Sequence, residues 1–127
     1  MPSLLCFLCF LCSVPVLLGA EHRDVGLTQK GNRIEASVFP GASSTSPTVL
    51  LIGGLAGDNE TARLVTREIQ TFEAIRQDQR RFRLLAISIA NPDSARLQFP
   101  PAGVAYRENS ESHALWRWIG TSRGMRT

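Results

Sequence analysis

Cysteine is missing from the sequence after residue 12, which limits the chemistry of everything that follows. All three cysteines, Cys6, Cys9 and Cys12, lie in one apolar block at the N-terminus. Each is preceded by leucine rather than by the glycine or alanine typical of a lipoprotein attachment site. If the block is removed, the mature chain can hold neither a disulfide nor a thiolate metal site.

A strong charge of one sign is also lacking. The formal net charge is only +3, and Lys30 is the one lysine. The arginines are spread between acidic residues, so nucleic acid is not an expected partner, because phosphate backbones are bound by clustered basic residues. The nearest approach to a cluster is Arg80, Arg81 and Arg83, which we interpret as part of a solvated loop.

The first twenty residues contain no charged side chain. The block is short for a membrane span, which is the alternative interpretation. A break at Pro15 and the small residues Gly19 and Ala20 are typical of a secretory signal with cleavage after Ala20. We therefore expect a signal peptide over residues 1–20 and one small domain over 21–127, exported to a periplasmic or extracellular location. Contact with a membrane is expected only through the export signal.

The stretch from Thr48 to Glu73 is the one around which the chain is organised. Residues 48–52 form an apolar run followed at once by Gly53 and Gly54, which predicts a buried strand and a tight turn. Asp58 and Asn59 are N-cap candidates for a helix over 60–74. Its apolar stripe contains Ala62, Val65, Ile69 and Phe72. A second buried strand is predicted over 83–89, parallel to the first because a helix connects them.

The remaining segments are less regular. Residues 34–39 alternate and predict an edge strand, whereas Glu21–Gly31 is polar and predicted to be irregular. A last helix is expected over 110–119, with Leu115, Trp116 and Ile119 on its apolar side. We expect Gly120 to end it, because Thr121–Thr127 shows no pattern. Three strands and two helices resemble the front half of a larger α/β domain.

The order of these features resembles the N-terminal half of the zinc carboxypeptidases, over residues 33–120. The residues that carry the resemblance are a strand, GGLAGDNE, a helix, a second strand, Asn91-Pro92-Asp93, then GVAYREN and a tryptophan-containing helix. The resemblance implies an α/β fold, a partial three-layer sandwich with a mainly parallel sheet.

Zinc is the cofactor that the resemblance implies. The family pattern after the first of these strands is G-G-x-H-x-x-E, whose His and Glu bind the metal. Here Ala56 stands at the His position, and the Glu position falls on Asn59, or on Glu60 if one extra residue is allowed. Glu60 is therefore the metal-ligand candidate. The family's third ligand and its general-base glutamate belong to a region beyond the matched segment, so firm zinc binding is not expected.

Two arginines and one asparagine are the substrate-site candidates by resemblance. Arg96 lies where the family places a catalytic arginine near the substrate carbonyl. Arg107 and Asn109 would bind the substrate's C-terminal carboxylate, although only a shift in register brings Arg107 into that position. A planar guanidinium suits the task, because it can hold a carboxylate through two hydrogen bonds.

Three functions remain open on the sequence. The first is an exported member of the zinc metallocarboxypeptidase family, which hydrolyses peptide C-termini, present here in a truncated or inactive form. The second is a non-catalytic module that binds peptides or cell-wall fragments through their carboxylates. The third is a different α/β hydrolase, which the absence of a G-x-S-x-G sequence disfavours. The expected partner in the first two cases is a peptide or a small molecule that carries a carboxylate.

Overall fold

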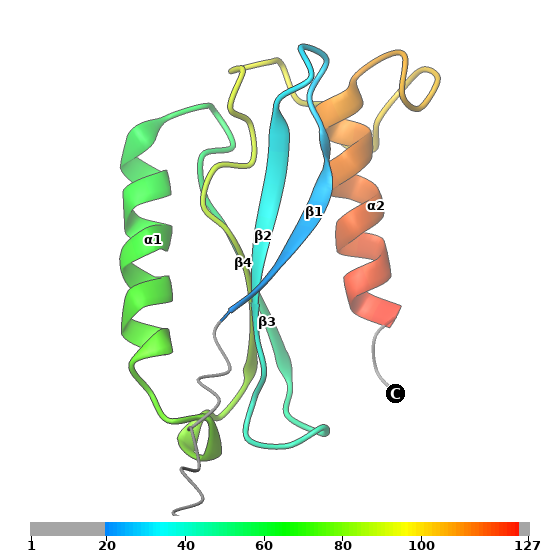
Figure 1. Ribbon diagram of the computed structural model, residues 1–127. Helices are drawn as coiled ribbons and strands as arrows, with labels where there is room; N and C mark the ends of the chain where they lie inside the picture. Colours follow the sequence, from blue (N-terminus) through cyan, green and yellow to red (C-terminus); the bar gives the residue numbers. More distant parts are fainter. Residues whose placement is uncertain (1–19, 125–127) are drawn as a thin grey trace, which may run out of the picture.

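The structure, a computed structural model, describes residues 20–124 (Figure 1). The three cysteines and nearly all of the predicted signal peptide lie outside the described residues. Along the chain the elements are β1 (Glu21–Leu27), β2 (Arg33–Phe39), β3 (Thr48–Ile52), α1 (Asn59–Glu73), the short 3₁₀ helix η1 (Gln77–Gln79), β4 (Arg83–Ile87) and α2 (Ser110–Gly124).

The strands form one mixed sheet in the order β1-β2-β4-β3. β1 pairs with β2 and β2 with β4 in antiparallel fashion, whereas β3 and β4 are parallel. In the parallel pair Leu50 lies opposite Leu85. The predicted parallel arrangement of these two strands is confirmed, as is the α/β class. The sheet as a whole is mixed rather than mainly parallel, because the additional strand β1 and the pairing of β2 with β4 are both antiparallel.

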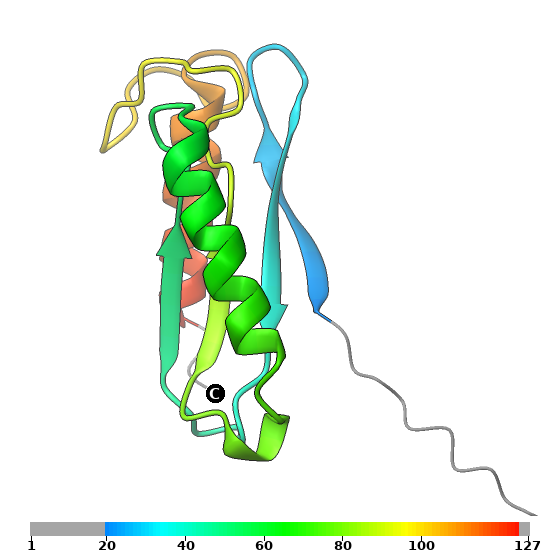
Figure 2. The same cartoon turned by 90° about the vertical axis from the view of Figure 1, so that its left-hand side faces the viewer.

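The two helices cover opposite faces of the sheet, so the described chain has three layers (Figure 1; Figure 2). Alternation along β4 supplies both cores, because successive side chains of a strand point to opposite faces. Leu84 and Ala86 pack in the core beneath α1, with Phe39, Val65 and Phe72. Ile87 packs in the core beneath α2, together with residues that include Ile34, Ala36, Ala114 and Leu115.

Helix α1 follows its sequence pattern closely. Asp58 precedes the helix in extended conformation and accepts a hydrogen bond from the Thr61 backbone N–H, as an N-cap residue does. Ala62, Val65 and Phe72 of the predicted stripe are buried, and Ile69 is partly buried against the same core.

The prediction for the N-terminal residues was wrong. Glu21–Leu27 forms β1 rather than an irregular segment, and β2 is consequently an interior strand and not an edge. β1 shows no apolar alternation, because Val25 is its only buried side chain. Its order comes from pairing with β2 across a bulge near Asp24 and Gly26, and that contact is invisible to local sequence reasoning.

The last helix was also mispredicted in part. α2 continues through Gly120 to Gly124. Glycine lowers helix stability without forbidding the helical conformation, so packing elsewhere along α2 can override it. Trp116 is 51% exposed and not on the apolar side, whereas Trp118 packs against the core.

Arg80 corrects the expectation of a solvated arginine loop. The residue is only 7% exposed. Its guanidinium donates to the carbonyl oxygens of Ile75 and Pro40 at 3.0 and 3.3 Å and lies over the rings of Phe39 and Phe72. These carbonyls and aromatic faces compensate the charge, so Arg80 ties the end of α1 to the end of β2.

Candidate functional site

The loops that follow β3 and β4 lie at one end of the sheet, as parallel neighbours require (Figure 1). The β1–β2 hairpin loop and the segment leading into α2 reach the same end. In open α/β sheets, ligands bind outside the carboxyl ends of the strands. This loop end is therefore the candidate functional site.

The loop after β3 can approach its neighbour closely because it is rich in glycine. Gly54 and Gly57 have φ angles of 63° and 75°, which side-chain-bearing residues rarely adopt. A Cβ on Gly57 would lie 2.0 Å from Ser94 Oγ, in the loop after β4. Glycine at this position thus permits direct contact between the two loops.

A hydrogen-bonded network joins the same loop to α1. Thr61 Oγ1 donates to Asp58 Oδ2 at 2.6 Å and accepts from the Gly54 backbone N–H at 2.9 Å. The Thr61 hydroxyl and backbone N–H together hold the pKa of the Asp58 carboxyl below its ordinary value. Asp58 therefore caps the helix and also braces the turn.

Asn91 organises the loop after β4. Its side chain is fully buried. Nδ2 donates to the carbonyl oxygens of Leu55 and Ala95 at 2.9 and 2.7 Å, and Oδ1 accepts from the Ala95 backbone N–H at 2.9 Å. One amide thus links the two loops and folds its own loop into a turn.

The β1–β2 hairpin contributes two further connections. Asn32 donates to the Asp93 carboxylate. The neighbouring Thr28 hydroxyl is the main cause that lowers the pKa of the Asp93 carboxyl, with Asn32 and Lys30 adding to it. The hairpin tip is thereby attached to the loop that carries Arg96.

The second connection runs from the hairpin to α2. The Gln29 backbone N–H donates to Oε1 of the buried Glu111 at 3.0 Å. The Gln29 side chain donates to the Arg107 carbonyl oxygen at 3.0 Å and accepts from the Ser110 hydroxyl. The hairpin therefore bridges the two loops that carry the substrate-site candidates.

The predicted substrate residues all belong to segments at the loop end of the sheet. Arg96 and Arg107 are exposed, and neither side chain forms a hydrogen bond or ion pair with another residue between 20 and 124. Asn109 is half-buried, and its Nδ2 donates to the Ala102 carbonyl oxygen at 3.0 Å within its own loop. The side chains of both arginines are therefore open to solvent, whereas the Asn109 side chain closes its own loop.

Solved structures share this architecture. The crystal structure of a metallo-carboxypeptidase from Burkholderia cenocepacia matches 84% of this chain and 34% of its own, with a TM-score of 0.64 and 14% identity. The fold is carboxypeptidase-like. The chain spans about a third of the length of that metallo-carboxypeptidase.

A second match is the carboxypeptidase A from Helicoverpa armigera, with a TM-score of 0.46 and 16% identity over 59% of this chain and 20% of that chain. No family model matches the sequence, and neither does any curated protein.

The donor groups present do not fit the zinc ion that a carboxypeptidase-like fold implies. A catalytic zinc takes three protein ligands and an open position. Ala56 offers only a methyl group, and Glu60 is exposed on the first turn of α1. Between residues 20 and 124, no group of three or more His, Cys, Asp or Glu side chains could hold a metal. We therefore derive no zinc chemistry from these residues.

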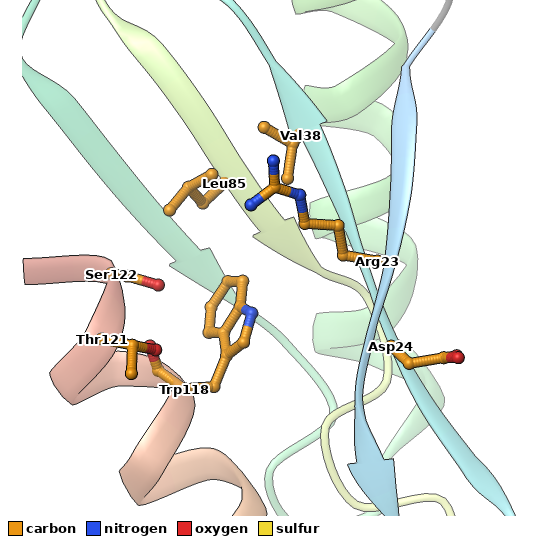
Figure 3. A pocket seen from close by; sticks show the side chains of 7 residues that line it. All are labelled: Arg23, Asp24, Val38, Leu85, Trp118, Thr121 and Ser122. Carbon is orange, nitrogen blue, oxygen red and sulfur yellow. The ribbon is translucent and has the colours of Figure 1, made fainter. Parts of the chain in front are cut away.

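A cavity of about 140 Å³ lies away from the loop end, between the sheet and the C-terminal half of α2 (Figure 3). Trp118 projects from α2 towards Leu85, Val38 and Arg23 of the sheet. Arg23 is paired with Glu21 at 2.9 Å. The space is lined mainly by apolar surface and a paired charge, so we assign no ligand to it.

No helix of the described residues is long and apolar enough to cross a bilayer.

Sequence reasoning missed the residues that hold the loops together. Asn91 was noted only as part of a motif, and Gln29 and Glu111 were not assigned to the site. An asparagine directly after a predicted buried strand is a usable signal in the sequence. If its side chain is buried, its amide group must find hydrogen-bond partners in neighbouring loops. The hairpin contacts join positions 78 to 82 residues apart and leave no local signal.

Proposed function

We propose that the chain is an exported carboxypeptidase-like protein that binds the terminal carboxylate of peptides through Arg96 and Arg107, without zinc hydrolysis of its own. The single observation that carries this proposal is the presence of two exposed, unpaired guanidinium groups on braced parts of the connection between β4 and α2. The exported location rests on the N-terminal block of the sequence.

Arg96 is held by its neighbours on both sides. Asn91 binds both backbone groups of Ala95, and Leu97 packs against the core beneath α2. The backbone of Arg96 is therefore anchored although its side chain extends into solvent. Anchoring lowers the entropy cost of binding, because less of the loop must be ordered when the ligand arrives.

Arg107 is anchored in a similar manner. Its backbone N–H donates to the Val104 carbonyl oxygen at 3.1 Å, and its own carbonyl oxygen accepts from Gln29. Two guanidinium groups on fixed backbones suit a carboxylate, since each presents a planar set of donors that match its two oxygens.

The fold likeness favours a second candidate, zinc-dependent hydrolysis of peptide C-termini, as in the family that the sequence resembles. The alanine at position 56 weighs against this activity for the residues present. Loss of a metal ligand removes the water-activating cation but leaves the carboxylate-binding arginines unaffected.

The proposal is tested by titrating fluorescent peptides that differ only in a free or amidated C-terminus. The free acid should bind, and amidation should abolish binding. Arg107→Ala or Arg96→Ala should weaken it about 10- to 100-fold, the value of one hydrogen-bonded charge pair. Arg67→Ala, an exposed arginine on α1, is the matched control and should bind as the unaltered protein does. Equal affinity for acid and amide peptides would rule the proposal out.

Export is tested separately by sequencing the N-terminus of the protein recovered from a secreting bacterial host. Cleavage after Ala20 predicts a product that begins at Glu21. A product that keeps Met1 and remains in the cytoplasm would contradict the exported location without affecting carboxylate binding.

A further inference from the structure

The turn between β1 and β2 is held closed by its own hydrogen bonds. The backbone N–H of the buried Thr28 donates to the Asn32 carbonyl oxygen at 2.8 Å, and the Thr28 hydroxyl accepts from the Asn32 backbone N–H at 2.9 Å. The Gly31 N–H donates to the Thr28 carbonyl oxygen at 2.9 Å, and Gly31 has a φ angle of 83°, which glycine adopts without strain. The groups that this turn directs outward therefore start from a fixed backbone.

The same turn contacts both of the segments that carry the candidate arginines. Asn32 donates to the carboxylate of Asp93, three residues before Arg96. The Gln29 side chain donates to the Arg107 carbonyl oxygen at 3.0 Å. These two bonds join positions 61 and 78 residues apart in the sequence. The turn is thus a common support for two parts of the connection between β4 and α2.

The segment around Arg107 depends on outside support, because its backbone is strained. Tyr106 and Asn109 have φ angles of 69° and 48°, which residues with side chains rarely adopt. A strained conformation persists only where surrounding contacts hold it. Gln29 makes two such contacts, with the Arg107 carbonyl oxygen at 3.0 Å and with the Ser110 hydroxyl at 3.2 Å. One side chain from the turn therefore holds this segment at two points.

The loop that carries Arg96 is supported in a similar way. Ser94, two residues before Arg96, has a φ angle of 54°. Thr28 and Asn32 together hold the pKa of the adjacent Asp93 carboxyl below its ordinary value. Asp93 is consequently ionised near neutral pH, and its hydrogen bonds to the turn are charge-assisted, which makes them stronger than bonds between neutral groups.

We infer that Gln29 and Asn32 are positioning residues for carboxylate binding, an inference that rests on the function proposed above. Gln29 acts through the backbone of Arg107, and Asn32 acts through Asp93 on the loop of Arg96. Neither positioning residue needs to touch the ligand. Because one closed turn holds both backbones, the two guanidinium groups extend from fixed points, and less of the site must be ordered when a carboxylate binds.

The test measures the Kd of a fluorescent peptide with a free C-terminus. Gln29→Met keeps the length of the side chain and removes its polar atoms, and Asn32→Ala removes the donor to Asp93. Each should raise Kd about 3- to 10-fold, the value of one neutral hydrogen bond. Gln70→Met makes the same change at an exposed glutamine of α1 and is the matched control, with an unchanged Kd.

Double variants distinguish a positioning role from a general loss of structure. Gln29→Met should have no further effect on Kd in the Arg107→Ala background and its full effect in the Arg96→Ala background, because coupled residues are not additive. Asn32→Ala should show the reverse pattern. A general loss of structure would weaken binding in every background. That result, or an unchanged Kd in both single variants, would overturn the inference.

Hydrogen exchange without peptide separates this inference from the proposed function. Gln29→Met should speed amide exchange over residues 104–110 about 3- to 10-fold, and Asn32→Ala should do so over residues 92–96, with no change in α1. If Gln29→Met fails to fold by circular dichroism, Ser110→Ala removes the hydroxyl bonded to Gln29 and takes its place.

Unchanged exchange in these segments would overturn the inference even if peptides bind to the unaltered protein. Faster exchange in a protein that binds no peptide would instead refute the proposed function, and would leave Gln29 and Asn32 as the residues that hold these two segments.

Discussion

Replacing Asn91 with aspartate changes one nitrogen to oxygen in a fully buried side chain and leaves its shape intact. In the unaltered protein, Asn91 Nδ2 donates to the carbonyl oxygens of Leu55 and Ala95. In Asn91→Asp an oxygen faces those two oxygens, and the introduced carboxyl group has no basic partner in its bonding set. The substitution therefore tests whether the amide holds the two loops together.

The magnitude follows from the lost contacts. Two hydrogen bonds are worth about 1 to 1.5 kcal/mol each, and a buried group without a partner adds about 1 to 3 kcal/mol. A total loss of about 3 to 6 kcal/mol is expected near neutral pH. For a domain of this size each kcal/mol lowers Tm by about 4 °C or more, so Tm should fall by at least about 12 °C.

The assay is urea unfolding followed by circular dichroism, repeated between neutral and acidic pH. Burial raises the pKa of the introduced carboxyl group, so it protonates as pH falls and regains one donor. The difference in the free energy of unfolding between the variant and the unaltered protein should therefore become smaller at acidic pH. Asn59→Asp is the matched control, because Asn59 is exposed on the first turn of α1, where a negative charge is favourable. A loss below about 1 kcal/mol for Asn91→Asp would refute the reasoning.

Three further outcomes are expected. Arg80→Ala should cost about 2 to 3 kcal/mol in urea unfolding, since it removes charged donors to buried carbonyls and contacts with two rings, whereas exposed Arg81→Ala should stay within about 0.5 kcal/mol. Asp58→Ala should lower Tm at neutral pH. Because the folded pKa of Asp58 lies below 3.8, this difference should persist above pH 3.8 and disappear as pH falls through that lower value. Ala56→His should yield neither sub-micromolar zinc binding by calorimetry nor release of C-terminal amino acids. Sub-micromolar zinc binding together with amino-acid release would establish a working metal site and would contradict this prediction.

The position of the candidate site could be predicted from the sequence, but the contacts that hold its loops together could not. Gly53, Gly54 and the polar residues after the second buried strand indicated loops at one sheet edge, and the parallel pairing of β3 and β4 confirms that geometry. The bracing of these loops by Gln29 and Glu111 depends on residues far apart in sequence. No local pattern encodes such a contact, because each partner alone reads as an ordinary polar residue.

The sequence by itself determined β3, α1 and β4, because strand length, glycine position and helical periodicity are local properties that a single segment expresses. Only the tertiary structure decided that Glu21–Leu27 is a strand and that Arg80 is buried. β1 obtains its hydrogen bonds from β2, and Arg80 obtains its partners from the ends of β2 and α1. A polar segment or a charge acquires order from the groups that satisfy it, and those groups are brought together only when the chain has folded.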